Sequence, residues 1–316
     1  MKALVTGAAG FIGSHVVAAL AASGAEVRAF DRATPLELPP GADFAKGDLL
    51  ERDDLRRALD GCDAVFHLAA LYSYSRADAQ AMERVNVEGT RLVIEHAGAR
   101  RVVHTASCAT CGPVAGRAAT EADLPAAWEL RVPYKRTKLA GERLALDAAA
   151  HGADVVVVNP TTPVGPGDRR PTPTGKMVAD VVSGRARAYL AGSALNIVAV
   201  EDVARGHLLA YEHGQVGRRY LLGGENLTMR EVFATICEAV GRRPPRIAVP
   251  WSAAYAAARF ASLVRGDPKL LVLDEVRVAR WPMRFDDSRA RAELGYSSEP
   301  AASALARAAR AVAPPA

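Results

Sequence analysis

Hydrophobic and polar positions predict a regular alternation of elements along the first half of the chain. Short, nearly continuous apolar runs, typical of buried strands, occupy residues 2–6, 26–30, 43–48, 63–70, 101–107 and 154–160. Stretches with the spacing of helices lie between them, at 11–24, 49–61, 77–98 and 134–150. Buried strands that alternate with helices are typical of a parallel sheet with helices on both faces. The pattern therefore predicts a doubly wound α/β fold.

The pattern is looser after Pro160, and we expect a second, smaller unit there. Residues 159–175 are rich in Pro and Gly and predict a long ordered loop, which in a compact domain is usually functional. The Ala- and Arg-rich tail from 301 predicts a surface helix with a frayed end. We expect one domain over 1–165, which regains parts of 195–222, and a smaller mixed α/β C-terminal domain over 166–316.

Composition and charge exclude several classes of protein. Half of the 316 residues are apolar, which is ample for a large core. The net charge is +5, and the basic residues are spread along the chain, so nucleic acid is not an expected partner. No apolar run reaches the roughly 18 residues that a membrane span needs, and the N-terminus does not resemble a signal peptide. With only four scattered cysteines, we expect a protein of the reducing cytoplasm.

The stretch "TGAAGFIG" at 6–13 lies between the first predicted strand and the first predicted helix. Glycines there permit a tight turn and a close approach of the backbone to a pyrophosphate, and the helix N-terminus offers free N–H groups. The spacing is GxxGxxG, and a plain glycine-rich turn is the alternative. We expect a dinucleotide coenzyme to contact this turn through Gly7, Gly10, Phe11, Ile12 and Gly13.

An acidic residue ends the second predicted strand and bears on the choice of coenzyme. The Asp31 carboxylate can accept hydrogen bonds from both adenosine ribose hydroxyls and would repel a 2′-phosphate, which favours NAD over NADP. Arg32 follows directly and can pair with a phosphate, so NADP stays an alternative. A turn-capping role is the other interpretation of Asp31.

Two further strand ends are expected near the coenzyme. Asp48, followed by Leu49, suits a contact with the adenine edge, and a helix N-cap is its alternative role. His67 is interpreted as a histidine packed in its strand rather than as a base. The residues after it end the fourth strand and are expected to line the coenzyme site: Leu68, Ala69 and Ala70.

The segment "VPYKRTK" places Tyr134 and Lys138 four residues apart, on one face of a predicted helix. A phenol has a pKa near ~10, and a neighbouring ammonium group and an oxidised nicotinamide both favour the phenolate and lower that pKa. Lys138 can also hold the nicotinamide ribose. Ser107 ends the fifth predicted strand, where such a sheet opens toward its ligand crevice. We expect Ser107 to hold the substrate oxygen while Tyr134 moves the proton.

Cys108 and Cys111 stand two residues apart and raise the question of a redox or metal centre. Zinc prefers four nitrogen or sulfur ligands, and only His104 is close in sequence. A thioredoxin-type pair begins a helix instead of following a serine at a strand end. No metal is therefore expected, and the two cysteines are interpreted as small side chains behind Ser107.

With these motifs the chain resembles the extended short-chain dehydrogenase/reductase family, also described as NAD-dependent epimerases/dehydratases. The similarity covers nearly the whole length and includes "GDL", "HLAA", "NVEGT", "NPTTPVGPGD" and "FDDSRARAELGY". It implies a Rossmann fold and a catalytic set of Ser107, Tyr134 and Lys138. It further implies that Asn86 supports the active site and that Pro160 flanks the nicotinamide.

Within the family the chain is most similar to hopanoid-associated sugar epimerases and to dihydroflavonol-reductase-like proteins. The resemblance implies a small-molecule substrate and a homodimer formed through the helix at 77–98 and the Tyr134 helix. Cys108-Ala109 replaces the acidic pair that follows the serine or threonine in sugar dehydratases, which argues against dehydration. Cys111 stands where many sugar-nucleotide members carry a tyrosine.

Three functions are compatible with these residues. The favoured one is a nucleotide-sugar epimerase that retains NAD, with a diphosphate held by basic residues: Arg169, Arg170, Lys176, Arg185 and Arg187. For that cluster a solvated surface is the alternative. The second function is an NAD(P)H-dependent ketoreductase or dehydrogenase. The apolar stretch at 250–264 would then form a lid over the substrate, and ordinary core packing is its alternative role. A coenzyme sensor without catalysis is disfavoured, because Ser107, Tyr134 and Lys138 are all present.

Overall fold

The computed structural model describes residues 1–169, 172–264 and 271–313. Its largest sheet contains seven parallel strands: β1 (Lys2–Thr6), β2 (Glu26–Asp31), β3 (Ala42–Lys46), β4 (Ala64–His67), β5 (Arg101–Thr105), β6 (Val155–Pro160) and β10 (Arg219–Leu222). The spatial order is β3-β2-β1-β4-β5-β6-β10. This is the strand order of a doubly wound Rossmann sheet, with β10 at the sixth position and beyond it no other described strand. The predicted fold class is confirmed.

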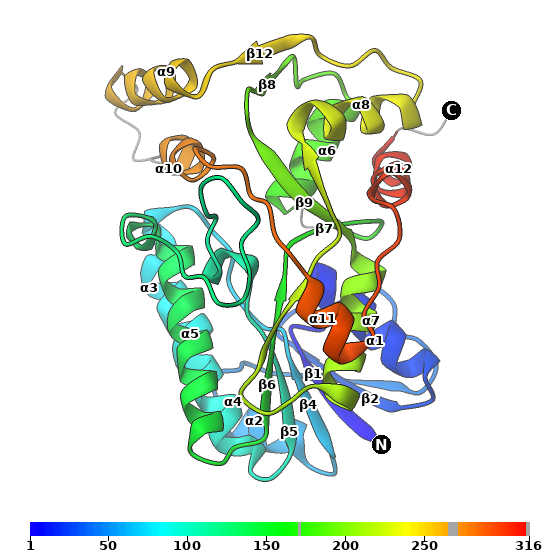
Figure 1. Ribbon diagram of the computed structural model, residues 1–316. Coiled ribbons are helices and arrows are strands. Elements are labelled where there is room, and N and C mark those ends of the chain that lie inside the picture. Colours follow the sequence, from blue (N-terminus) through cyan, green and yellow to red (C-terminus); the bar gives the residue numbers. More distant parts are fainter. Residues whose placement is uncertain (170–171, 265–270, 314–316) are drawn as a thin grey trace.

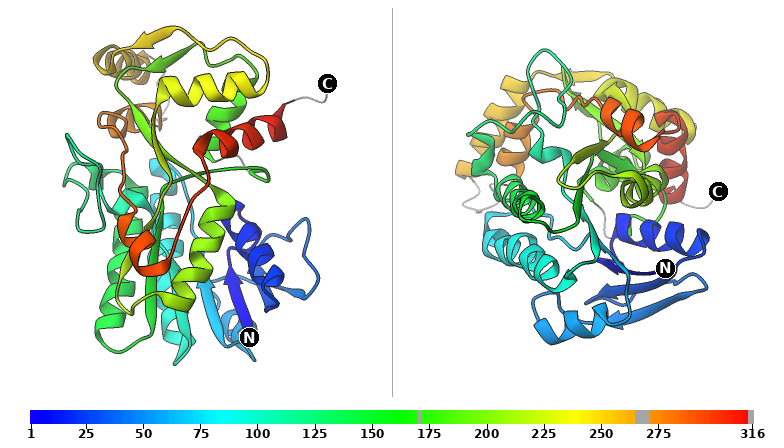
Figure 2. Two further views of the ribbon diagram at one scale, coloured as in Figure 1. Left: turned by 45° about the vertical axis from the view of Figure 1, so that its right-hand side comes forward. Right: turned by 60° about the horizontal axis from the view of Figure 1, so that its bottom comes forward.

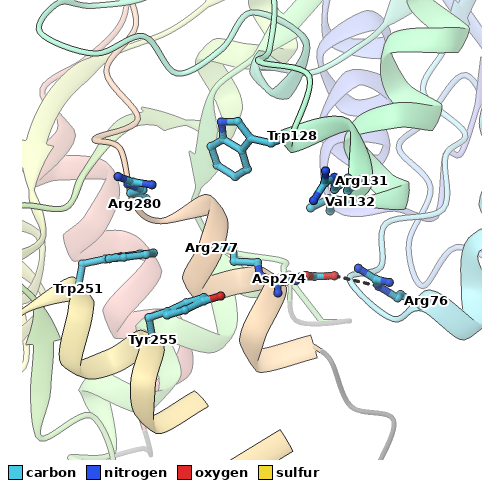
Figure 3. Close-up of a pocket in the computed structure, with 9 residues that line it drawn as sticks. All are labelled: Arg76, Trp128, Arg131, Val132, Trp251, Tyr255, Asp274, Arg277 and Arg280. Atoms are coloured by element: carbon cyan, nitrogen blue, oxygen red, sulfur yellow. Dashed lines mark hydrogen bonds and ion pairs between the residues drawn. The ribbon is translucent and has the colours of Figure 1, made fainter. Parts of the chain in front are cut away.

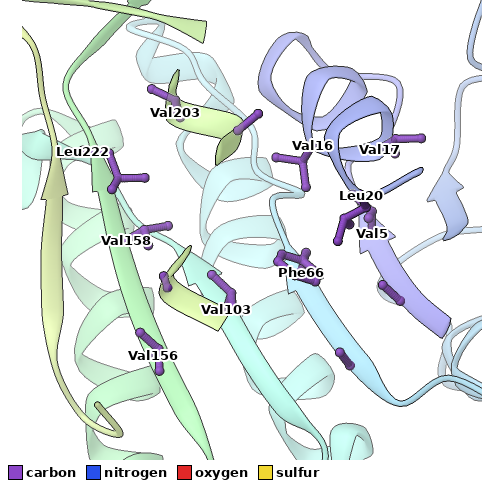
Figure 4. Packing of buried hydrophobic residues seen from close by; sticks show 14 of the residues in the cluster. Val5, Val16, Val17, Leu20, Phe66, Val103, Val156, Val158, Val203 and Leu222 are labelled. Atoms are coloured by element: carbon purple, nitrogen blue, oxygen red, sulfur yellow. The ribbon is translucent and has the colours of Figure 1, made fainter. Parts of the chain in front are cut away.

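Helices cover both faces of this sheet (Figures 1 and 2). One face carries α1 (Phe11–Ala22), α7 (Val200–His213) and α11 (Ser288–Leu294), and the other carries α2 (Arg52–Leu59), α4 (Gly89–Ala97) and α5 (Pro133–Ala150). Figure 4 shows how Val16 and Leu20 of α1 meet Val5 and Phe66 of the strands. Each such side chain contributes about 1.5–3 kcal/mol when it is fully buried. The continuous apolar strands thus hold the sheet between two helical layers.

A smaller unit lies beyond the carboxyl ends of the parallel strands, at the top of Figure 1. Its strands are β7 (Thr162–Val164), β9 (Ala194–Ala199) and β11 (Glu225–Thr228) in one sheet, and β8 (Ala188–Leu190) and β12 (Ile247–Val249) in another. Its helices are α6 (Pro173–Val182), α8 (Met229–Ala239), α9 (Trp251–Val264), α10 (Leu271–Val278) and α12 (Ala301–Val312). The chain passes repeatedly between the two units, because α7 and β10, and later α11, return to the large sheet.

Several element boundaries differ from those predicted. The third strand ends at Lys46 instead of 48, and the helix that follows begins at Arg52 instead of 49. The stretch at 77–98 is composite: a 3₁₀ turn (Arg76–Asp78), α3 (Ala79–Glu83), a π-helical segment (Arg84–Glu88) and α4 follow one another. The apolar spacing of the sequence could not reveal the π-helical segment. Its wider turn adds only one residue, so the buried face of the helix shifts by one position.

The predicted long loop at 159–175 contains regular structure at both ends. β7 pairs with β9, and α6 begins at Pro173, which suits the first helical position because it has no N–H to leave unpaired. The Thr172 hydroxyl caps α6 by accepting from the Gly175 N–H at 3.0 Å. The prediction of a loop across the whole stretch was therefore wrong, although 170–171 lie outside the described residues.

Two expectations about the last third of the chain change. The helix after 301 is α12, and it buries Ala301, Ala304 and Leu305 against the smaller unit, so it is amphipathic and not merely superficial. The predicted frayed end falls partly on 314–316, outside the described residues. The stretch at 250–264 forms α9, which exposes 68% of Phe260 and is therefore not ordinary core. Nowhere in the described chain is a helix both long and apolar enough to cross a membrane.

Candidate active site

A cavity of about 950 Å³ opens at the carboxyl ends of β1, β2 and β4. This is the edge where ligands bind in open parallel sheets. Ten of the predicted coenzyme residues line it: Gly7, Gly10, Phe11, Asp31, Arg32, Asp48, Leu49, Leu68, Ala69 and Ala70. The structure therefore brings together segments from four separate parts of the sequence.

The glycine turn is built by close packing of its own backbone. Gly7 has φ +70°, and a Cβ there would lie 2.7 Å from the backbone nitrogen of Ala69. A Cβ on Gly13 would lie 2.1 Å from the carbonyl oxygen of Gly7. Gly13 and Ile12 do not line the cavity: Gly13 seats α1 on the turn, and Ile12 packs against the core. The turn thus leaves a cradle at the helix N-terminus that suits a pyrophosphate.

The acidic residues at the strand ends also brace their own loops. The Asp31 carboxylate accepts from the Ala9 N–H at 3.1 Å and from the Ala33 N–H at 2.9 Å, so it holds the glycine turn while it lines the cavity. Asp48 accepts from the Leu50 N–H at 3.0 Å, and Glu51, not Asp48, occupies the N-cap of α2. Both turn-capping and coenzyme contact are therefore open to Asp31.

Ser107, Tyr134 and Lys138 come together where β5 ends and α5 begins. Tyr134 is the second residue of α5, after Pro133, and its phenol lies close enough to the Ser107 hydroxyl for that hydroxyl to affect its pKa. One turn later the Lys138 Nζ donates to the Thr105 carbonyl oxygen at 2.7 Å. The spacing of four residues therefore places Tyr134 near Ser107 and Lys138 against the last residue of β5.

Burial governs the ionisation of these groups. Removal from water raises the pKa of the Tyr134 phenol, and the nearby Ser107 hydroxyl acts in the opposite direction. Burial lowers the pKa of Lys138 to about 8, while the nearby Glu142 carboxylate acts to raise it. The expected lowering of the Tyr134 pKa by Lys138 is thus not seen, since desolvation is the larger effect and the Lys138 Nζ is held by Thr105.

Two tyrosines that sequence reasoning missed surround the Tyr134 phenol. The ring centroids of Tyr72 and Tyr134 lie 4.2 Å apart, and those of Tyr74 and Tyr134 lie 6.3 Å apart. Tyr72 and Tyr74 line the cavity, whereas Ser107, Tyr134 and Lys138 do not. Tyr134 therefore adjoins the cavity through the ring of Tyr72. The signal was the segment "LYSYS" at 71–75, directly after the "HLAA" strand end.

Asn86 connects the segment at 71–75, the tyrosine loop, to α5. Its Oδ1 accepts from the Leu71 N–H at 2.7 Å, and its Nδ2 donates to the Leu71 carbonyl oxygen at 3.0 Å. Nδ2 also donates to the Thr137 hydroxyl, which lies between Tyr134 and Lys138, at 3.1 Å. Asn86 belongs to the π-helical segment, a feature that is frequent at functional sites. Asn86 thus holds Leu71 against α5, and a supporting role in the active site stays a prediction.

These features coincide with a family-wide match. Residues 3–223, about two thirds of the chain, match the model of the NAD dependent epimerase/dehydratase family. The chain belongs to this family. The members named among its relatives include NAD(P)-dependent reductases and dehydrogenases, and the chain is accordingly an enzyme of this type.

Similar proteins and structures cover almost the whole chain. The putative dihydroflavonol 4-reductase of Synechocystis is 36% identical over 96% of this chain and 92% of its own length. Sterol demethylase protein B of Methylococcus capsulatus is 36% identical over 93% of each chain. The crystal structure of gox2253 is 36% identical with a TM-score of 0.86, over 98% of this chain and 97% of that one. MoeE5, solved with UDP-glucuronic acid and NAD, is 29% identical with a TM-score of 0.76 and covers 98% of both chains.

A second buried network, also missed, lies behind Ser107 in this member of the epimerase/dehydratase family. The Asn159 Nδ2 donates to the Ser107 carbonyl oxygen at 3.2 Å and to Glu142 at 2.5 Å. The Thr110 hydroxyl donates to Glu142 at 2.7 Å, and Arg219 from β10 lies 3.1 Å from the same carboxylate. Pro160, next to Asn159, is buried at the end of β6 and does not line the cavity.

The two cysteines of the segment are buried thiols. Burial raises the pKa of Cys108 and of Cys111 to about 12, so neither is a thiolate near neutral pH. The Cys111 sulfur accepts from Arg219 at 2.8 Å. No group of three or more potential metal ligands occurs among the described residues. His67 is buried in β4 and hydrogen-bonded to Thr6 at 2.8 Å, in agreement with a packed strand histidine.

Proposed function

We propose that this enzyme catalyses NAD-dependent oxidoreduction of a secondary alcohol or ketone. One observation carries the proposal: the Tyr134 phenol lies near the Ser107 hydroxyl and packs on Tyr72, and Tyr72 lines the cavity that also contains the glycine turn. A nicotinamide coenzyme supplies or accepts the hydride when bound. The chain's own residues then need only orient one oxygen and move one proton.

Each of the three residues has a distinct role in the proposal. The Ser107 hydroxyl donates a hydrogen bond to the substrate oxygen, and the Tyr134 phenol gives its proton to that oxygen during reduction or takes it during oxidation. The Lys138 ammonium favours the phenolate that remains after proton donation. Asn86 positions the tyrosine loop and the Thr137 region without contact with the substrate.

The proposed coenzyme is NAD. Asp31 ends β2 with its carboxylate at the cavity, where it would repel a 2′-phosphate. The Arg32 guanidinium lies 3.8 Å from Asp48, and this contact partly offsets its attraction for such a phosphate. MoeE5 was solved with NAD. We expect NADH to bind at least tenfold more tightly than NADPH, as measured by calorimetry.

Net oxidoreduction has more support here than the epimerisation favoured from the sequence. The Synechocystis relative is named as a reductase. Among the basic residues expected to hold a diphosphate, Lys176 and Arg185 both pair with Asp180 at 2.7 Å. Arg170 lies outside the described residues. Epimerisation of a nucleotide sugar with retained NAD stays the second candidate, because MoeE5 was solved with UDP-glucuronic acid.

The two candidates differ in whether the coenzyme exchanges. The purified enzyme is incubated with NADH and a panel of ketones while the absorbance of NADH is followed. We expect steady NADH oxidation over many turnovers with at least one ketone, and no coenzyme retained after gel filtration. Tightly retained NAD, together with a change at one stereocentre of UDP-glucuronic acid, would favour the epimerase instead.

A further inference from the structure

A second cavity, of about 590 Å³, lies between the segment that precedes α5 and the helices α9 and α10 (Figure 3). Its volume is in the range of small-molecule sites in proteins. Trp128 lines one side and faces Trp251 and Arg280 across the cavity. The lining contains three aromatic rings and four arginines: Trp128, Trp251, Tyr255, Arg76, Arg131, Arg277 and Arg280.

This cavity adjoins the active site through shared segments. The segment at 71–76 contributes Tyr74 to the large cavity and Arg76 to the second one. Helix α10 contributes Glu275 to the large cavity and its neighbour Asp274 to the second. Val132, two residues before the catalytic Tyr134, also lines the second cavity. A molecule whose reacting carbon lies beside Tyr134 could therefore place a remote group there.

The charges in the cavity do not balance. Asp274 is buried, and it forms ion pairs with Arg76 at 3.3 Å and with Arg277 at 2.8 Å. Its single negative charge therefore neutralises only one of these two guanidinium groups. Within 1–169, 172–264 and 271–313, neither Arg131 nor Arg280 has a carboxylate partner. The cavity thus has a surplus of positive charge, and guanidinium groups bind carboxylate and phosphate oxygens in pairs.

The aromatic rings are held in place and present flat faces. Trp251 and Tyr255 are stacked, with centroids 4.9 Å apart and planes 16° apart. The Trp251 Nε1 donates to the Val276 carbonyl oxygen at 2.7 Å, which fixes the indole against α10. The Arg280 guanidinium lies over the Trp251 ring at 5.2 Å, and such stacking leaves the N–H edges free for an anion.

We propose that the second cavity binds an anionic group on a flat or apolar body, a carboxylate or a phosphate that the substrate carries away from its reacting carbon. The geometry alone defines an anion site. That the anion belongs to the substrate rests on the proposed function. Arg131 and Arg280, on opposite sides of the cavity (Figure 3), are the two guanidinium groups available to the anion, and the rings of Trp128 and Trp251 contact the body of the ligand. The enzyme accordingly selects substrates that carry a remote negative charge.

Calorimetry with three probes of one shape tests the site in the full-length protein. The probes are para-acetylbenzoate, para-acetylphenyl phosphate and the neutral acetophenone. We expect at least one anion to bind at least tenfold more tightly than acetophenone, and the better of the two identifies carboxylate or phosphate as the natural group. Equal affinity for all three probes, or no binding by any of them, would overturn the proposal.

Variants show whether the affinity depends on the named arginines. Arg131→Gln combined with Arg280→Gln is expected to remove the tenfold preference for the anion. Arg243→Gln is the matched control, because Arg243 is exposed and lines neither cavity, and it is expected to keep the preference. A preference that persists in the double variant, with a thermal unfolding midpoint like that of the wild type, would contradict the assignment.

The result is separable from the proposed function because calorimetry needs no turnover. If no ketone is reduced but anion binding depends on Arg131 and Arg280, the anion site stands and the oxidoreductase proposal fails. If ketones are reduced but neither anion gains affinity over acetophenone, the oxidoreductase proposal stands and the anion site fails.

Discussion

At the scale of single residues, the site combines a crowded phenol with a buried amine. Tyr134 is enclosed by Tyr72 and Tyr74, and this desolvation raises the pKa of its hydroxyl, so the phenol keeps its proton until a reaction removes it. Lys138 is buried as well, and its pKa falls to about 8. A protonated phenol suits a residue that donates a proton to a ketone, and an ammonium group nearby stabilises the phenolate left behind.

The lowered pKa of Lys138 predicts how the activity depends on pH. The ammonium form is present below pH 8 and is lost as the pH rises through about 8. We expect kcat/KM for ketone reduction to fall about tenfold per pH unit above that point, because this ratio reports groups of the free enzyme. Lys138→Arg keeps its charge throughout, so any activity that it retains should lack this decline. An identical alkaline decline in both proteins would show that another group causes it.

Candidate site residues could be predicted from the sequence only where local patterns along the chain identify them. Tyr134, Lys138 and Asp31 were singled out because helix spacing and strand ends are local signals. Arg219 meets Cys111 across 108 residues and lies beside Glu142, and neither contact leaves a periodic trace. The role of Tyr72 was missed for the same reason, since its ring meets Tyr134 only after the fold has formed.

At the scale of elements, the glycine turn is defined by the contact between β1 and α1. The Cβ of an alanine at Gly13 would lie 2.1 Å from the Gly7 carbonyl oxygen, and that oxygen belongs to rigid backbone. At Gly10 the nearest atom would be 3.1 Å away, and the backbone there is extended with φ −79°. The two positions therefore differ in tolerance although both are glycines of one motif.

Alanine substitutions should separate these two positions. We expect Gly13→Ala to lower the free energy of unfolding by about 1–3 kcal/mol, because overpacking forces the backbone to shift, and to weaken NADH binding. Gly10→Ala is the matched variant and should cost less than about 1 kcal/mol. Urea unfolding and calorimetry with NADH measure the two effects. Equal losses in both variants would contradict the packing described for α1.

Three histidines are buried in the core in their neutral form. Burial lowers the pKa of His67 in β4 to about 3 and that of His207 in α7 to about 4. Burial also lowers the pKa of His104 in β5, and neither ring nitrogen of His104 has a hydrogen-bond partner. The unfolded chain binds protons near pH ~6.5 at each site, whereas the folded chain does not.

The depressed pKa values predict a loss of stability in mild acid. Because the unfolded state binds more protons below pH ~6.5, each histidine should reduce the free energy of unfolding by about 2 kcal/mol between pH 7 and pH 5. His104→Leu removes one titrating group without breaking a hydrogen bond, so its loss over this range should be smaller than that of the wild type. Urea unfolding at both pH values measures this. Equal losses in the two proteins would contradict the account.

Element boundaries illustrate what a one-dimensional pattern can show. The order of strands and helices followed from apolar runs, since the inner strands β1, β4, β5 and β6 are buried on both faces of one sheet. The short strand β7 and the start of α6 were hidden within a Pro-rich stretch, because a three-residue strand has no measurable period. The pairing of β7 with β9 depends on a segment more than 30 residues away.

At the scale of the whole molecule, the enzyme combines a coenzyme sheet with a smaller unit over its carboxyl edge. We propose the division at residue 165 with 195–222 shared, since β10 joins the large sheet while β9 belongs to the smaller one. The anion cavity uses both parts of the chain, because Arg76 pairs with Asp274 across 198 residues. No sequence pattern predicts such a pairing, which arises only from the way the two units meet.

We propose that the enzyme is a homodimer through the composite helix at 77–98 and α5, as its family resemblance implies. Leu144 of α5 and Val87 in the π segment before α4 are partly exposed apolar residues on this side. Light scattering should give a mass of about 67 kDa, twice the chain mass of 33.3 kDa. Leu144→Asp should shift the mass toward the monomer, because it introduces a charge into the contact. A wild-type protein of monomer mass at micromolar concentration would rule out this interface.

The most direct test of the central claim is the rate of NADH oxidation by Tyr134→Phe, with the ketone that the wild type reduces fastest. We predict a fall of about 10²–10⁴-fold with unchanged NADH affinity, because only the proton-carrying hydroxyl is lost. Tyr211→Phe serves as the control, since its ring packs on Phe66 within the core, away from the cavity, and its rate should match the wild type. A Tyr134→Phe enzyme that oxidises NADH at the wild-type rate would contradict the account.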